Sequence, residues 1–350
     1  MPALALATSM GCSNRPDDAG ENPAPTGGGG DTPASRPPGV LVANYGDLRG
    51  ADLGDGASLN GALAFPADNA WNRDVSADPV DVRSDALLAS IGLDKALHPD
   101  FGAGLYEGAP IGIPYRIVDA AQAKVPIVFT AYGDESDPGP YPMPRNTPIE
   151  GERSDLVDTG GDRHAIVIDR DNSRLFELYR AFVQPDGSWR ADSGAVFDLS
   201  SNQVRPGAMP GWTSADAAGL PIFPGLVRYD EAAAGRIAHA LRFTVARTRR
   251  AWVAPATHFA STTSDPNLPP MGMRVRLKAS FALAPGIDPQ VRAILQALKT
   301  HGMLLADNGS DWFVSGAPDP RWNNAALKRE FAQVRGRDFE VLRMDGLVAG

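Results

Sequence analysis

Short runs of β-branched and aromatic residues, each bounded by Gly, Pro, Asp or Asn, recur along the chain and limit the folds open to it. Runs of this kind predict strands. The predicted strands are residues 112–118, 125–131, 164–169, 174–182, 189–198, 241–248, 251–255, 273–281 and 312–315. The 37 glycines and 31 prolines favour many turns and ordered loops between them. The pattern therefore favours a loop-rich β fold over a helical bundle.

Helices are fewer, and the clearest is predicted at residues 289–301. Asp288 can cap its N-terminus, Pro289 occupies its first position and Gly302 ends it. Its apolar positions follow the i, i+3, i+4, i+7 rule and are Val291, Ile294, Leu295 and Leu298. Weaker helical patterns cover residues 84–91, 231–240 and 324–334. Because helices do not alternate with strands, we expect a mainly β (α+β) fold with peripheral helices, arranged as an antiparallel β-sandwich or jelly-roll-like domain.

Composition divides the chain into four parts. Residues 1–12 are similar to a bacterial lipoprotein signal, because a short apolar run precedes Cys12. Residues 13–40 lack large apolar side chains and predict a disordered tether. Residues 41–69 are an uncertain lead-in, and residues 70–345 are expected to form a single globular domain.

The charge and the cysteine usage exclude several partners. A net charge of -9 argues against nucleic-acid binding, and no apolar run is long enough to span a bilayer. Cys12 is the only cysteine, so a lipid on Cys12 is the one expected link to a membrane. We therefore expect an exported protein, at the outer surface or in the periplasm and lipid-anchored. No zinc, dinucleotide or phosphate-loop motif is present, and we expect neither a metal nor a cofactor.

Residues 162–179 read as two apolar runs joined by a polar turn. A turn centred on Asp171-Asn172 makes Ile168 face Leu175, Ile166 face Glu177 and His164 face Tyr179. The apolar face, which predicts core, is Ala165, Val167, Phe176 and Leu178. The other face carries His164, Glu177 and Tyr179. It is either a surface or barrel-lining face with a His-Tyr hydrogen bond, or the floor of a site where His164 tunes a catalytic Glu177.

Two further segments carry candidate ligand-binding residues. Residues 273–281 alternate strictly and place Arg274, Arg276 and Lys278 on one face. Those cations form either a solvated face or a groove for carboxylated or phosphorylated ligands. His258 lies in a long Pro-, Ser- and Thr-rich loop before that strand, and loops on a rigid scaffold often carry function.

Residues 304–314 join two apolar runs through a polar turn. The turn contains Asp307, Asn308, Asp311 and Trp312. It is either a simple hairpin turn or part of a sugar site, in which Trp312 would stack on a pyranose ring.

Two longer motifs carry a resemblance to a known family. They are Trp212-Thr-Ser-Ala-Asp-Ala-Ala-Gly-Leu-Pro221 and Asp265-Pro-Asn-Leu-Pro-Pro-Met-Gly272. With them, the chain over about residues 70–340 resembles an uncharacterised family of exported bacterial proteins, many of them lipoproteins. The resemblance implies an exported globular protein and no particular activity.

Three functions remain open on this evidence. The preferred one is a hydrolase of polysaccharide or cell-wall glycan, in which Glu177 pairs with Asp307 or Asp169 across the scissile bond. The second is a polysaccharide lyase. It would use Arg274, Arg276 and Lys278 to neutralise a uronate, with His164 or His258 and Tyr179 as base and acid. The third is a glycan-binding or structural envelope protein without catalysis.

Overall fold

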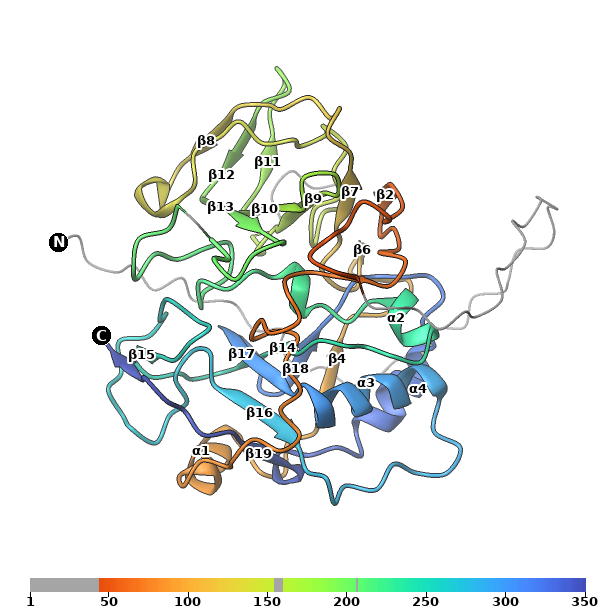
Figure 1. Ribbon diagram of the computed structural model, residues 1–350, viewed down its shortest axis with the longest axis vertical. Helices are drawn as coiled ribbons and strands as arrows, with labels where there is room; N and C mark the ends of the chain where they lie inside the picture. The colour runs from red at the N-terminus through yellow and green to blue at the C-terminus, as the bar shows by residue number, and fades with distance from the viewer. Residues whose placement is uncertain (1–43, 154–159, 206) are drawn as a thin grey trace.

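The computed structural model describes residues 44–153, 160–205 and 207–350. The predicted signal at residues 1–12, including Cys12, and the predicted tether at residues 13–40 lie outside the described residues. Figure 1 shows strands β7 to β13 in one half of the molecule and strands β14 to β19 in the other. The candidate residues come from both halves, because the two main sheets carry most of them.

The first main sheet has five strands and contains the hairpin of residues 162–179. Its strands in spatial order are β13 (Ser193–Asp198), β10 (Arg174–Tyr179), β9 (Ala165–Asp169), β7 (Arg116–Val118) and β2 (Gly54–Asp55). β10 is antiparallel to β9 and β13, whereas β7 is parallel to β9. A three-stranded sheet accompanies it and consists of β11 (Phe182–Val183), β12 (Trp189–Ala191) and β8 (Ile127–Phe129).

The second main sheet has six strands and contains the predicted basic strand. Its strands in spatial order are β19 (Phe339–Val341), β16 (Arg274–Leu277), β17 (Met303–Asn308), β14 (Leu241–Val245), β18 (Phe313–Ser315) and β4 (His98–Asp100). β17 and β18 lie on opposite sides of β14, parallel and antiparallel to it. Residues 309–312 therefore carry the chain across the end of β14, and the hairpin-turn interpretation of this segment is wrong.

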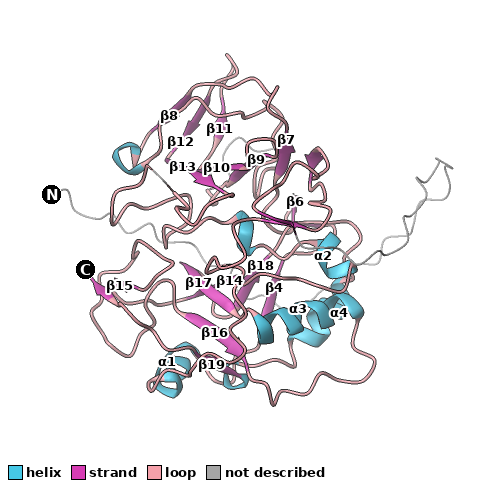
Figure 2. Cartoon of the chain, viewed as in Figure 1, coloured by secondary structure: helices cyan, strands magenta, loops and turns pink. Residues whose placement is uncertain are grey.

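Small sheets and helices surround the two main sheets (Figure 2). The two-stranded sheets are β1 (Asn44–Tyr45) with β3 (Ala62–Leu63), β5 (Leu105–Tyr106) with β6 (Ala109–Pro110), and β15 (Ala251–Trp252) with β20 (Val348–Ala349). The helices are α1 (Ser84–Ile91), α2 (Tyr229–Ala233), α3 (Pro289–Thr300) and α4 (Asn324–Phe331), with 3₁₀ turns η1 (Gly133–Glu135), η2 (Phe223–Gly225) and η3 (Gly336–Asp338). Helices α1, α3 and α4 contact β19, β16 and β4 of the six-stranded sheet. Within the described residues, no helix has the length and apolar character to cross a membrane.

Helix α3 forms where the sequence predicts it. The Asp288 carboxylate accepts hydrogen bonds from the backbone N–H groups of Gln290 (2.9 Å) and Val291 (3.4 Å), which satisfies two donors that a helix start leaves unpaired. Gly302 follows the helix with φ 67°, a conformation that glycine adopts at little cost. The predicted apolar positions of the helix are buried.

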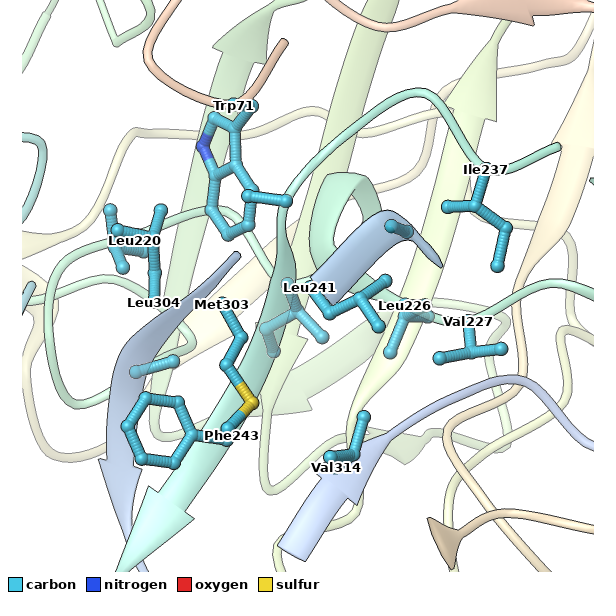
Figure 3. Packing of buried hydrophobic residues seen from close by; sticks show 14 of the residues in the cluster. Trp71, Leu220, Leu226, Val227, Ile237, Leu241, Phe243, Met303, Leu304 and Val314 are labelled. Carbon is cyan, nitrogen blue, oxygen red and sulfur yellow. The ribbon is translucent and has the colours of Figure 1, made fainter. Parts of the chain in front are cut away.

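Two hydrophobic clusters hold the sheets together. The larger one joins them, because it contains Ile166 of β9 together with Leu241 of β14; Figure 3 shows Leu241 beside Phe243, Met303 and Trp71. The smaller cluster packs on the other face of the β9–β10 pair and contains Val167. The five-stranded sheet therefore has apolar packing on both of its faces. Residues of the lead-in also enter the larger cluster, among them Leu48, Leu59 and Phe65.

The prediction of a mainly β fold with peripheral helices is confirmed, since the structure is 26% strand and 14% helix. Both main sheets are mixed, because each contains at least one parallel pair of strands. The sandwich or jelly-roll arrangement and the single-domain organisation of residues 70–345 stay predictions.

Candidate functional site

The β9–β10 hairpin has the register expected from a turn centred on Asp171-Asn172. The backbone pairs include Ile168 with Leu175 and Ile166 with Glu177. The rings of His164 and Tyr179, just beyond the last pair, lie 5.9 Å apart. Parity therefore placed His164, Glu177 and Tyr179 on one face, as predicted.

This face of the hairpin does not form an open binding surface, because Glu177 is 0% exposed and lies within the larger hydrophobic cluster. Its carboxylate accepts hydrogen bonds from the backbone N–H groups of Ile222 (3.0 Å) and Phe223 (2.9 Å), at the start of η2. Burial raises the pKa of Glu177 to about 7 in spite of these bonds. This geometry supports a structural role for Glu177, which anchors η2 to β10, and does not fit the catalytic role predicted for it.

His164 is buried, and both of its ring nitrogens face acceptors. Nδ1 lies 2.5 Å from Oε2 of Glu150, and Nε2 lies 3.0 Å from the carbonyl oxygen of Ala215. Two acceptors require two N–H donors, which only the imidazolium has. Burial opposes this charge, but the Glu150 carboxylate outweighs it and raises the pKa of His164 to about 9. His164 is thus a cation at neutral pH without a lone pair to act as a base.

A second buried ion pair joins Asp216, in the loop before η2, to Arg242 on β14. Arg242 on β14 donates to Oδ2 of Asp216 (3.3 Å) and to Oγ of Ser315 (2.7 Å). The Asp216 side chain is 0% exposed, and among the described residues its Oδ1 atom has no hydrogen-bond partner. Burial raises the pKa of Asp216, and the charge of Arg242 opposes that rise.

Asp307 is brought to this ion pair by backbone contacts. The N–H of Ala218, two residues after Asp216, donates to the carbonyl oxygen of Ala306 at 3.0 Å. Burial raises the pKa of Asp307 to about 8, and the carboxylates of Asp216 and Asp162 add to the rise. Asp307 is half-buried, and the N–H of Asn308 donates to its Oδ1 at 2.6 Å, so Oδ2 is the oxygen left to hold the proton.

Three further residues lie on the solvent side of Asp307 and the Asp216–Arg242 pair. They are Tyr179, Asp162 and His258. Tyr179 is half-buried; burial and the carboxylates of Asp162 and Asp307 raise its pKa to about 12. Asp162 is exposed, and surrounding protein atoms still raise its pKa. Nδ1 of His258 bonds the carbonyl oxygen of Ala217 at 2.8 Å, which holds the ring beside the Asp216 loop.

We call one group of six charged residues the acidic cluster. Its cations are His164 and Arg242, and its acids are Glu150, Asp162, Asp216 and Asp307. The members shift one another's pKa values, and the carboxyl groups outnumber the cations. Burial and, after it, the negative charge of Asp216 and Asp162 raise the pKa of Asp307 to about 8, so Asp307 keeps its proton at neutral pH. A protonated, half-buried carboxyl that interacts electrostatically with a second, exposed carboxyl can carry general acid–base chemistry. No group of three or more His, Cys, Asp or Glu within the described residues is arranged to hold a metal ion.

Other predicted site residues have structural partners elsewhere. Asp169 lies at the turn end of β9, where its carboxylate accepts from the backbone and side chain of Asn172 (3.1 and 2.7 Å). Asp311 accepts from the N–H of Ala246 and pairs with Lys95 at 2.5 Å. Asp169 therefore cannot pair with Glu177 across a substrate, and Asp311 stabilises the crossing over β14.

Trp312 and Asn308 also work within the fold. Trp312 is 0% exposed, stacks on Phe243 and Phe339, and donates from Nε1 to Gly92 at 3.1 Å. The prediction that Trp312 stacks on a sugar is therefore wrong. The Asn308 side chain accepts from Thr248 and donates to the carbonyl oxygen of Ala260, both at 2.8 Å, so it fastens the His258 loop to β17.

The basic segment formed by β16 and the following Lys278 is not a ligand groove, because each of its cations has an internal partner. Arg274 donates to the carbonyl oxygen of Ala70, and burial lowers its pKa to about 10. Arg276 binds Oε1 of Glu340 at 2.6 and 2.9 Å. Lys278 donates to the carbonyl oxygen of Arg337 at 2.7 Å. The ligand-binding role predicted for these three residues is therefore not supported.

The sequence reasoning missed Glu150, Asp162, Asp216 and Arg242. Arg242 had a detectable signal, because it interrupts the apolar strand at residues 241–245. Asp216 lies in the motif at residues 212–221, which was noted only for a resemblance. Glu150 and Asp162 lie in loops without any pattern that marks them. No family model matches the chain, and no curated protein or solved structure matches it either.

Proposed function

We propose that the protein hydrolyses a polysaccharide or cell-wall glycan at the acidic cluster, with Asp307 as the general acid in place of Glu177. The observation that carries the proposal is the raised pKa, about 8, of a half-buried Asp307. Glycoside hydrolysis needs an acid that is protonated at neutral pH and a second carboxyl that is ionised. Asp162, exposed and held near Tyr179 and His164, is the second carboxyl of the proposal.

In this mechanism Asp307 donates its Oδ2 proton to the glycosidic oxygen as the bond to the anomeric carbon breaks. Asp162 takes a proton from a water molecule, whose oxygen then bonds to that carbon. Arg242 favours the ionised form of Asp216, and burial together with the charge of Asp216 favours the proton on Asp307 until the bond breaks. His164 stabilises the charge on Glu150 at the buried side of the site.

The contacts of the cations disfavour a lyase. A lyase needs a cation to neutralise the uronate carboxylate, and Arg274, Arg276 and Lys278 donate to internal partners. His164, with both nitrogens bonded, has no lone pair to take the proton. An excess of carboxyl groups would also repel a uronate.

An exported location remains part of the proposal, with Cys12 as the point of lipid attachment. It is supported by the apolar run before Cys12 and by the polar composition of residues 13–40. A glycan of the cell envelope is the substrate class that this location would present.

The test is release of reducing ends from a panel of neutral and amino-sugar polysaccharides. Asp307→Asn removes the proton and keeps the shape, so we expect a loss of about 10²–10⁴ in kcat. Asp345→Asn is the matched control, because Asp345 is exposed and far along the chain from the cluster; its activity should be unchanged. Undiminished release by Asp307→Asn overturns the assignment.

Two further outcomes separate the alternative functions. Products that absorb in the ultraviolet would indicate an unsaturated sugar, and therefore a lyase. Binding of a polysaccharide without any release of reducing ends by the wild-type protein would favour a non-catalytic binder.

A further inference from the structure

A surface pocket of about 450 Å³ lies between helix α3, the chain after α2 and the loop that follows Trp71. It shares no residue with the acidic cluster. Its volume is within the ordinary range for small-molecule sites. The residues that matter for its chemistry are Tyr45, Asn72, Asp74, Arg236, Gln296 and His301.

Several of these groups are held in place by the fold and keep atoms free for a ligand. The Asn72 amide donates to the carbonyl oxygens of Ala64 (2.7 Å) and Pro66 (2.9 Å), which leaves its Oδ1 as an acceptor. His301 bonds the carbonyl oxygen of Arg73 through Nδ1 at 3.0 Å, and burial lowers its pKa, so the ring is neutral with an acceptor at Nε2.

The two charged residues balance each other. A hydrogen bond from Ser76 (2.8 Å) lowers the pKa of Asp74, so this carboxylate is ionised. The guanidinium of Arg236 is exposed and has no hydrogen-bond or ion-pair partner among the described residues. A pocket with one acid, one guanidinium and two amides offers both donors and acceptors but no net charge.

We propose that this pocket is a second, non-catalytic binding site for a neutral, hydroxyl-rich ligand the size of one or two sugar rings. A planar polar side chain, such as an amide or a guanidinium group, can form hydrogen bonds to two neighbouring sugar hydroxyls at once. Tyr45 supplies an aromatic surface for the apolar face of a sugar ring. The walls are preorganised, because Ala293 and Ala297 of α3 and Ile237 belong to the packed interior. The proposal does not depend on the hydrolase assignment, since the two sites have separate residues.

The experiment measures binding by ligand-observed NMR and by calorimetry. The probes are the neutral tetramers of β1,4-linked glucose and N-acetylglucosamine, with trigalacturonate as the anionic comparison. We expect the wild-type chain to bind a neutral tetramer and not the trigalacturonate. Arg236→Ala should weaken binding about tenfold, which corresponds to about 1.4 kcal/mol. Gln296→Trp should abolish it, because the indole fills the pocket from an exposed helix position.

Arg292→Ala is the control on the same helix, since Arg292 is exposed and does not line the pocket; it should bind as the wild type does. Asp307→Asn should also bind normally, which keeps this site distinct from the acidic cluster. Absence of neutral-sugar binding at millimolar concentration, full binding by Gln296→Trp, or preference for trigalacturonate would each overturn the proposal. Normal thermal unfolding of Gln296→Trp is the check that the variant is folded.

Discussion

The basic strand β16 and the acidic cluster both place several like charges close together, yet the fold treats them differently. On β16, Arg276 has the carboxylate of Glu340 at 2.6 Å, and Lys278, the residue after the strand, has a backbone carbonyl at 2.7 Å. In the acidic cluster, carboxyl groups outnumber the cations, and Oδ1 of Asp216 is buried without a hydrogen-bond partner in the described part of the chain. Repulsion is neutralised in the first region and retained in the second.

The comparison teaches how to separate structural charges from candidate functional ones. A charge with an internal counterion stabilises the fold and has its hydrogen bonds satisfied. A charge held among like charges shifts the pKa values around it, at a cost to stability, and such costs are typical of working sites.

Arg276→Met should have the largest effect on stability. The change leaves Glu340 without its partner and removes the donors to the carbonyl oxygens of Val75 and Asp78, so we expect a loss of about 3 kcal/mol in the free energy of unfolding. Urea denaturation measures it. The activity of the folded fraction should not change, and a loss of glycan binding in a folded variant would return β16 to the list of ligand sites.

Glu177→Gln should come next, at about 2 kcal/mol. The amide keeps one acceptor oxygen but turns an N–H group toward the N–H groups of Ile222 and Phe223, so one buried donor loses its partner. The measurement is again urea denaturation, with kcat determined on the folded fraction. A stable variant without turnover would instead support the catalytic role that the structure disfavours.

Stability should fall with rising pH because of the acidic cluster. Asp307 has a pKa of about 8 in the folded chain and an ordinary value near 4 when unfolded, so its proton stabilises the fold below pH 4 and this contribution is lost as pH rises through 8. The slope for one carboxyl is at most about 1.4 kcal/mol per pH unit. Unfolding of the wild type and Asp307→Asn at pH 5 to 8 should give a flatter profile for the variant. Parallel profiles would show that Asp307 titrates normally.

Lys278→Met should have the smallest effect, below about 0.5 kcal/mol. Its single bond, to the carbonyl oxygen of Arg337, is exposed, and that oxygen can turn to water. Thermal unfolding and binding of trigalacturonate are the two measurements. A clear drop in trigalacturonate binding would mean that Lys278 contacts an anionic ligand after all.

Part of the fold was predictable because local patterns suffice for it. The alternation in residues 162–179 fixed the hairpin register, and the capping residue Asp288 with the apolar spacing fixed α3. The candidate site was predictable only in part: His164 and Asp307 belong to the acidic cluster, and Tyr179 and His258 lie near it. The assignments of Glu177, Trp312 and the β16 cations failed because burial and counterions depend on segments far apart in the chain.

By itself, the sequence determined the mainly β class, the parity of the hairpin faces and the ends of α3, because turn chemistry and side-chain period act over a few residues. Only the tertiary structure decided that Glu177 is enclosed by core, that Arg276 meets Glu340, and that Asp216 and Asp307 share one site. The physical reason is that a pKa and a hydrogen-bond partner depend on the distance between groups, and the packing of the two sheets sets those distances.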